Sequence, residues 1–232
     1  MKKILTMLLA LCLVFSIVSC NKVDPNEKSE GVMTHAEFIA AAAEADVVIE
    51  GFVQAKQGWW GNEAVVYLQD GDGGYYIYKL PCTEAEFDTL TEGTKIQVTG
   101  KKAIYNGMHE VMYVTDWKIV GTDTYTAKAK DVTDKLANDE ALVNYLGALV
   151  KFSDVTVVSV SYKNNEPGDD IYLNFSKDGA EYSVTVEAYL TDANSDVYAA
   201  VGALAAGDVI DVEGYLQWWN QLDAHVIKVT KK

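Results

Sequence analysis

Cysteine, proline and histidine are all scarce in this sequence of 232 residues, with three of each. Cys12 and Cys20 lie near the N-terminus, which leaves Cys82 as the only cysteine in the body of the chain. An intrachain disulfide is therefore excluded there, and the core has to be stable without one. Aromatic residues, by contrast, are plentiful, with 14 Tyr, 5 Trp and 6 Phe, and 49% of the residues are hydrophobic. This composition excludes a low-complexity or disordered chain.

Positive charge is also in short supply. The chain has 19 basic and 34 acidic residues, a formal net charge of −15, and without Lys2 and Lys3 the balance is 17 against 34, or −17. Nucleic-acid binding is driven largely by Lys and Arg neutralising phosphates, and like charge repels over a Debye length of about 8 Å. The composition therefore argues against a nucleic-acid partner and leaves room only for a local basic patch around Lys95, Lys101 and Lys102.

The first residues have the pattern of a secretory signal. Two lysines are followed by an apolar run from Met7 to Phe15 and by the small residue Ser19. The apolar run is too short to span a membrane comfortably. We expect residues 1–19 to be a signal peptide that is removed.

The tetrapeptide Ile-Val-Ser-Cys that ends at Cys20 resembles the lipobox of bacterial lipoproteins. The resemblance implies that Cys20 carries acyl chains and begins the mature chain; the alternative is a simple signal peptide with an incidental cysteine. Each buried methylene of an acyl chain contributes about 0.8 kcal/mol to membrane binding. We expect residues 20–33 to be the lipidated cysteine and a polar, flexible tether, so that the protein is anchored to a membrane of the cell envelope.

The body of the chain repeats itself at an offset of 114 residues. The positions that match are Gly93, Ile96, Val98, Gly100 and Asn106, which recur as Gly207, Ile210, Val212, Gly214 and Asn220. In each half, β-branched and aromatic runs separated by turn clusters predict three strands, a helix and two more strands, with another helix in front. Two copies at this period indicate tandem domains rather than a solenoid. We place them at residues 34–122 and 123–232.

Three strands, a helix and two strands is the order of the OB-fold, a five-stranded Greek-key barrel. The fold class expected is mainly β, with two tandem five-stranded OB-fold-like Greek-key barrels, each with short helices. Gly51, Gly100 and Gly214 fall inside predicted strands. Glycine weakens a strand unless the backbone must bend there, so we expect corners or bulges at these positions.

Residues 45–121, and more loosely 145–230, resemble the OB-fold modules of secreted bacterial nucleases and the tandem OB-fold lipoproteins of Bacteroidetes. The stretches that carry the resemblance are IEGFVQA, VYLQDGDGGYYIY, EGTKIQVTGKKAIYNGMHEV and AGDVIDVEGYLQWW. It implies an envelope location, in keeping with Asn21 after the lipidated cysteine, at the outer membrane on its periplasmic or surface face. It also implies single-stranded nucleic-acid binding, or a place as accessory module of an exported enzyme system, as alternative functions.

OB-folds bind ligands on the face of strands two and three and on the flanking loops. The aromatic residues predicted there are Trp59, Trp60, Tyr75, Tyr76, Tyr78, Tyr105, Trp218 and Trp219. Flat rings stack on bases, at about 1–3 kcal/mol each, or on sugars. The other interpretation is packing: strand alternation predicts that one tryptophan of each pair faces its barrel and the other covers the rim.

Catalytic and metal-binding patterns are missing. A calcium loop starting at Asp70 would need a glutamate where Pro81 stands, so a glycine-rich hairpin turn is the expectation. His35, His109 and His225 have no zinc-type spacing, and we expect each at the surface or on a strand face. No cofactor, metal or catalytic residue is expected. The function predicted is a non-catalytic binding or scaffold lipoprotein that engages a glycan or an envelope protein through its aromatic loops.

Overall fold

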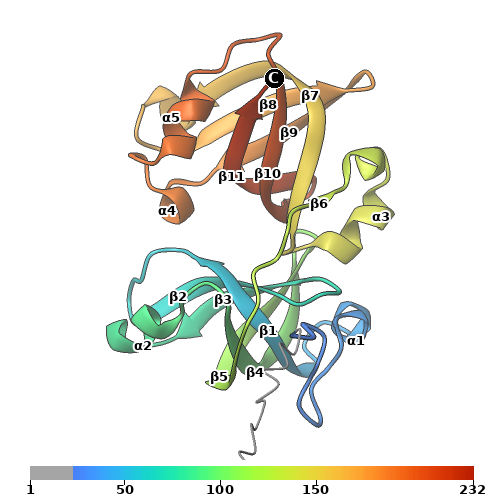
Figure 1. The fold of residues 1–232 in the computed structure, drawn as a ribbon, viewed down its shortest axis with the longest axis vertical. Helices are drawn as coiled ribbons and strands as arrows, with labels where there is room; N and C mark the ends of the chain where they lie inside the picture. Colours follow the sequence, from blue (N-terminus) through green and yellow to red (C-terminus); the bar gives the residue numbers. More distant parts are fainter. Residues whose placement is uncertain (1–22) are drawn as a thin grey trace, which may run out of the picture.

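The computed structural model describes residues 23–232. The predicted signal peptide and the lipidation site at Cys20 lie outside the described residues. The protein is mainly β and consists of two closed five-stranded barrels in series, one above the other in Figure 1. The fold class expected from the sequence is confirmed: these are tandem OB-fold-like barrels.

Barrel 1 follows the predicted order of elements. Its elements are α1 (His35–Ala40), β1 (Asp46–Lys56), β2 (Glu63–Gln69), β3 (Gly74–Pro81), α2 (Glu84–Thr89), β4 (Thr94–Tyr105) and β5 (Met108–Thr124). The strands run β1-β2-β3-β5-β4 around the barrel, and β4 pairs with β1 to close it. The β3–β5 pair is parallel and the others are antiparallel, which is the Greek-key arrangement of the OB-fold.

Barrel 2 repeats this arrangement. Its elements are β6 (Lys130–Asp131), α3 (Asp139–Leu142), β7 (Leu149–Tyr162), β8 (Ile171–Lys177), β9 (Ala180–Val186), α4 (Ala188–Thr191), α5 (Asp196–Gly202), β10 (Val209–Trp218) and β11 (Leu222–Lys231). Pairing of β10 with β7 closes the barrel, and the short β6 pairs with the outer edge of β7. The single helix expected over residues 133–147 is instead α3 between two turns of 3₁₀-helix, η1 (Thr133–Lys135) and η2 (Val143–Tyr145).

Each barrel has its own hydrophobic core, built from the inward-facing residues of every strand. In β2, Val66 and Leu68 face the core of barrel 1, and in β8 Leu173 and Phe175 face that of barrel 2. Complete burial of such a side chain contributes about 1.5–3 kcal/mol. The alternate residues of the same strands point outward, and in barrel 1 many of them meet the other barrel.

Two of the three glycines that we expected at corners or bulges lie at bulges, whereas Gly51 pairs with Ile96 in the regular β1–β4 ladder. The β4–β5 register shifts at Gly100, and the β10–β11 register shifts beside Gly214. A Cβ at Gly100 would lie 2.8 Å from the carbonyl oxygen of Met112, and one at Gly214 would lie 2.7 Å from that of His225. The backbones approach too closely for any side chain, which explains why both copies have glycine here.

The segment before α1 differs from the flexible tether expected over residues 20–33. Its described part lies against barrel 1, where the Lys28 ammonium donates to the carboxylate of Asp70 and to the backbone oxygen of Glu50, both at 2.6 Å. α1 begins with a capping box, since Thr34 accepts from the backbone N–H of Glu37 and the Glu37 carboxylate accepts from that of Thr34. No helix within residues 23–232 is both long and apolar enough to cross a membrane.

Candidate ligand-binding site between the barrels

The outer face of β2 and β3, where an OB-fold commonly binds its ligand, is covered in barrel 1 by barrel 2. Tyr67 on β2 is completely buried and stacks on Tyr215 of β10, with ring centroids 4.6 Å apart. Burial raises the pKa of Tyr67 and lowers the pKa of His225 to about 4. The Tyr67 hydroxyl is hydrogen-bonded to Nδ1 of a neutral His225; in the tautomer in which the hydroxyl donates, the other ring nitrogen of His225 carries the proton.

The β4–β5 turn of barrel 1 also meets the β10–β11 turn of barrel 2. Gly107 forms a β-bridge with Trp219, and a Cβ at Gly107 would lie 2.3 Å from the indole ring of Trp218. Met108 is buried in the core of barrel 2 although it belongs to β5. The barrels are thus held together at two places, and pockets lie along this seam.

The first, which we term the seam pocket, has a volume of about 480 Å³. It is lined by Tyr76, Tyr78, Tyr105, Met108, Glu110, Met112, Gln217, Trp218, Trp219 and His225. Barrel 1 contributes one wall through β3, β4 and β5, and barrel 2 contributes the other through β10 and β11. Its size and aromatic lining are typical of a small-ligand site.

Three polar groups face this aromatic pocket. The Glu110 side chain is buried, burial raises its pKa to about 7, and its carboxyl group has no hydrogen bond or ion pair within residues 23–232. Gln217 is 7% exposed, and its buried Nε2 also has no partner among the described residues. Native proteins pair nearly all buried polar groups. The buried, unpaired Nε2 of Gln217, with Glu110 and the second ring nitrogen of His225 in the same pocket, therefore indicates a place where a ligand forms hydrogen bonds.

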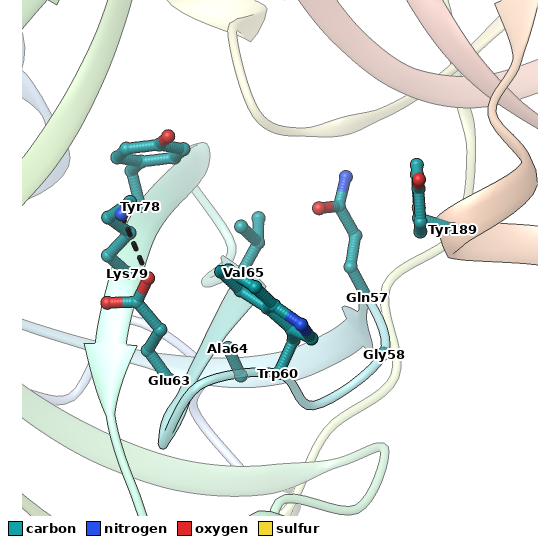
Figure 2. Close-up of a pocket in the computed structure, with 9 residues that line it drawn as sticks. All are labelled: Gln57, Gly58, Trp60, Glu63, Ala64, Val65, Tyr78, Lys79 and Tyr189. Atoms are coloured by element: carbon teal, nitrogen blue, oxygen red, sulfur yellow. Dashed lines mark ion pairs between the residues drawn. The ribbon is translucent and has the colours of Figure 1, made fainter.

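A second pocket of about 460 Å³, the rim pocket, adjoins the first and shares Tyr78 with it. It is lined by Gln57, Gly58, Trp60, Glu63, Ala64, Val65, Tyr78, Lys79 and Tyr189 (Figure 2). Barrel 2 contributes Tyr189 of α4, whose backbone oxygen accepts from Gly58 at 3.2 Å. Trp60 and Tyr189 are both 78% exposed. Exposed rings on both sides make an open, apolar groove that continues from the seam pocket.

Most of the aromatic residues predicted from the sequence gather in these pockets. Those that line one or both are Trp60, Tyr76, Tyr78, Tyr105, Trp218 and Trp219. Two predicted residues do not. Trp59 packs against the barrel 1 core with its indole N–H donating to the Cys82 carbonyl oxygen at 2.9 Å, and Tyr75 is buried with its hydroxyl on Asp70.

The tryptophan pairs divide as strand alternation predicts. Trp59 and Trp218 pack against the barrel cores, while Trp60 and Trp219 are exposed. Trp219 meets Tyr105 edge to face, with centroids 5.3 Å apart. Packing and ligand contact are not exclusive, since Trp218 contacts its core and also lines the seam pocket.

Positive charge is lacking around both pockets. All 19 basic residues of the chain are lysines, so the bidentate guanidinium contacts suited to phosphate are excluded. Lys79, the lysine of the rim pocket, pairs with Glu63 at 2.9 Å (Figure 2). Neither pocket therefore presents an unpaired cation from its lining residues.

The local basic patch considered from the sequence does not form. Lys95 pairs with Glu50 at 3.3 Å and Lys101 with Asp46 at 2.8 Å. Lys102 is fully buried, burial lowers its pKa to about 8, and its ammonium donates to the Phe38 carbonyl oxygen. Three neighbouring lysines in sequence are thus used for internal contacts.

The corresponding face of barrel 2, on β8 and β9, remains uncovered and is polar. Tyr172 is 36% exposed there, and Asn174 and Ser183 line a shallow depression. Lys163, in the loop before β8, pairs with Asp170 at 2.9 Å. This face has few rings on which a ligand could stack, so the seam is the better candidate site.

The residues singled out for chemistry other than stacking have structural roles. Asp70 closes the β2–β3 turn by accepting from the backbone N–H groups of Asp72 and Gly73, each at 2.8 Å, so the expected hairpin turn is confirmed. Burial raises the pKa of the Cys82 thiol. His35 is buried beneath α1 rather than lying at the surface.

The polar residues of the seam pocket were missed by sequence reasoning. Glu110 has a weak signal, because the alternation Met108, Glu110, Met112 places one acid on an otherwise apolar strand face. Gln217 and His225 have none, since both look like ordinary outward-facing residues of barrel 2 until barrel 1 packs against them.

No protein-family model and no curated protein matches this chain. Among solved structures, it is similar to an aspartyl tRNA synthetase from Entamoeba histolytica, at 22% identity over 41% of this chain and with a TM-score of 0.31. The chain covers only 22% of the length of that synthetase.

Two further solved structures are similar over most of this chain. One is the Ifi202 HINa domain in complex with 20-base-pair double-stranded DNA, at 12% identity over 83% of this chain and 98% of that one, with a TM-score of 0.35. The other is a Replication Protein A heterotrimer bound to single-stranded DNA, at 11% identity over 82% and 49%, with a TM-score of 0.33. Likeness at this level says nothing of function, and the fold class rests on the strand pairing.

Proposed function

We propose that this protein is a non-catalytic binding protein that holds a glycan chain in the groove between its two barrels. The observation that carries the proposal is the gathering of seven Tyr and Trp side chains, from both barrels, in two pockets that share Tyr78. Flat rings provide stacking surfaces for the faces of sugars, and the buried polar groups of Glu110 and Gln217 provide hydrogen bonds. A groove with successive stacking surfaces suits a chain of rings better than a single compact ligand.

The charge of the site supports the same ligand class. The lining residues of the two pockets include one lysine, which is paired, and two carboxylates, so a polyanion gains little there. A neutral glycan carries no charge for these two carboxylates to repel. An envelope protein that inserts an apolar segment into the groove is the outcome to consider if no glycan binds.

Single-stranded nucleic acid is the second candidate, because the exposed rings of Trp60 and Trp219 can stack on bases as well as on sugars. Two observations oppose it. The β2–β3 face of barrel 1 is occupied by barrel 2. Three lysines of barrel 1 are ion-paired, Lys79, Lys95 and Lys101, and Lys102 is buried. Any binding of this kind has to use stacking with little help from phosphate contacts.

Isothermal titration calorimetry of the purified protein tests the proposal, with a panel of neutral oligosaccharides and a thymidine oligonucleotide at about 50 and 200 mM salt. We expect saturable binding of at least one glycan, with an affinity that does not change with salt. Trp60→Ala and Trp219→Ala should each weaken it about five- to hundredfold, from about 1–3 kcal/mol of stacking. Tyr113→Ala is the control, because Tyr113 is 65% exposed but lines neither pocket.

Binding of the oligonucleotide that falls steeply with salt would overturn the proposal in favour of nucleic acid. Glycan binding that both tryptophan variants leave unchanged would move the site away from the seam.

We also propose that the protein is anchored at the cell envelope. Lipid attached at Cys20 would tether the barrels to an envelope membrane, and the outer membrane is the one we propose. Growth of the producing cells with a labelled fatty acid tests this directly. Label that is lost in Cys20→Ser supports the anchor, and an unlabelled wild-type protein contradicts it.

A further inference from the structure

The polar groups of the seam pocket indicate which functional group of a glycan the pocket recognises. We infer that the pocket recognises the acetamido group of an N-acetylated sugar, with Glu110 accepting from the amide N–H while Gln217 and His225 donate to its carbonyl oxygen. The inference rests on the proposed function and specifies the class of glycan that the pocket binds.

The acceptor belongs to the wall formed by barrel 1. The parallel pairing of β3 and β5 sets Glu110 beside Tyr76. Strand alternation puts Met108 and Met112 on the same face as Glu110, and all of them line the seam pocket. The carboxyl group therefore lies beside the Tyr76 ring and two thioether side chains, and within residues 23–232 the Tyr76 hydroxyl forms no hydrogen bond with it.

The donors belong to the opposite wall, on barrel 2. In the antiparallel β10–β11 pair, Tyr215 is opposite His225 and Gln217 is opposite Asp223. Gln217 and His225 are therefore diagonal neighbours on one face, within reach of a common partner. The hydrogen bond between the Tyr67 hydroxyl and Nδ1 of His225 leaves the other ring nitrogen free for a ligand, and that nitrogen is the donor in the tautomer in which the hydroxyl donates to Nδ1.

The Glu110 carboxyl group and the Gln217 amide can form hydrogen bonds for which residues 23–232 provide no partner. Glu110 is 5% and Gln217 is 7% exposed, and within residues 23–232 neither the Glu110 carboxyl group nor Nε2 of Gln217 forms a hydrogen bond; of the two, Nε2 is the fully buried atom. A buried carboxyl group without a partner is costly, and burial raises the pKa of Glu110 to about 7. A ligand that donates to it removes part of that cost.

An amide fits two walls of this kind because its N–H and C=O point to opposite edges of one plane. A hydroxyl at the same position has one heavy atom, so it can form hydrogen bonds with only one of the two walls. An ammonium group would satisfy Glu110 but would also face the N–H groups of Gln217 and His225. The methyl of an acetamido group can lie on apolar lining such as Trp218 and Met112.

Three trimers with the same β-1,4 linkage test the inference by calorimetry: N-acetylglucosamine, glucose and glucosamine, which differ in the substituent on carbon 2. We expect the wild-type protein to bind the acetamido trimer at least about tenfold more tightly than the glucose trimer, as one or two additional hydrogen bonds would give. Glu110→Leu and Gln217→Leu should each reduce this ratio of affinities to near one. Tyr113→Ala, on an exposed position outside the pocket, should leave the ratio unchanged.

The ratio of the two affinities distinguishes loss of acetamido recognition from damage to the fold, because a misfolded variant loses affinity for both trimers together. Equal affinity of the wild-type protein for the acetamido and glucose trimers would overturn the inference and leave glycan binding in place. Tightest binding of the glucosamine trimer would also overturn it, and would assign Glu110 to a cation. If none of the trimers binds, the inference fails, and the broader glycan panel decides the proposed function separately.

Discussion

The backbone N–H of Asn220 donates to the backbone oxygen of Asn106 at 2.7 Å. These two asparagines occupy equivalent positions of the internal repeat, 114 residues apart, and both have a positive φ, 58° and 49°. Each lies in the turn between the last two strands of its barrel. The repeated turns are therefore in contact with each other, and the repeat that defines each barrel also helps to join the two.

Replacement of Gly107 tests this contact between turns. Gly107 has φ +92°, and a Cβ there would lie 2.3 Å from the Trp218 ring, so Gly107→Ala combines backbone strain with a clash. Gly121→Ala is the matched control, because Gly121 has φ +68° and nothing lies within 4 Å of its added Cβ. We expect the control to lose about 1–2 kcal/mol of stability from strain alone, and Gly107→Ala to lose clearly more in urea denaturation. Equal losses would mean that the Trp218 ring moves away freely.

Loss of one hydroxyl should weaken the seam. Tyr67→Phe leaves Nδ1 of His225 without its donor, at an expected cost of about 1–3 kcal/mol in the free energy of unfolding. Tyr125→Phe serves as control, since the Tyr125 hydroxyl has no hydrogen bond among residues 23–232, and should cost little. The measurement is chemical denaturation of both variants beside the wild type. A neutral result for Tyr67→Phe would show that the hydroxyl contributes no net stability at the seam.

Glu110→Gln should change how stability depends on pH. Burial raises the folded-state pKa of Glu110 to about 7 from an ordinary 4.5, so folding favours its protonated form and its ionisation destabilises the protein as pH rises from 4.5 to 7. The variant has no such ionisation. We expect its stability relative to the wild type to increase across that range and to level off above pH 7, as followed by urea denaturation. A difference that does not vary with pH would mean that the carboxyl group already has a partner.

The buried histidines should have the opposite effect. Burial lowers the pKa of His109 to about 4 and also lowers that of His35. In both cases the unfolded chain takes up the proton first, so stability is lost as pH falls from about 6.5 toward 4. His109→Gln should lose less stability than the wild type between pH 7.5 and 5, measured by denaturation at each pH. Equal losses in the two proteins would show that His109 titrates normally in the folded state.

Asp70 should hold the segment before α1 on barrel 1. Its carboxylate accepts from the Lys28 ammonium, the Tyr75 hydroxyl and two backbone N–H groups, and its side chain is 1% exposed. Asp70→Ala leaves a buried ammonium without its counter-ion, which typically costs about 3–5 kcal/mol. Asp72→Ala is the control, because Asp72 is exposed and, among residues 23–232, its side chain accepts only from Asn26, so the change should cost less than about 1 kcal/mol.

Limited proteolysis provides a second readout for Asp70. We expect cleavage within residues 23–33 to become much faster in Asp70→Ala than in Asp72→Ala. Slow cleavage in both variants would show that other contacts hold the segment.

The sequence by itself determined the class of each barrel and most of its elements. Strand alternation, the capping box at Thr34, and the glycines at 100 and 214 are local signals, because they reflect backbone geometry and burial within one domain. The same alternation separated the packed Trp59 from the exposed Trp60. It could also have drawn attention to Glu110, a single acid on an apolar strand face.

The tertiary structure decided which surfaces remain free. Outward-facing residues such as Tyr67 and Gln217 would be solvent-exposed on an isolated barrel, and they are buried, with His225 half-buried, only because barrel 2 docks on β2 and β3 of barrel 1. That docking joins residues more than 100 positions apart and leaves no periodic trace in the chain. The loss of solvent around Glu110, and with it the shift in its pKa and its need for a partner, therefore follows from the way the two barrels pack.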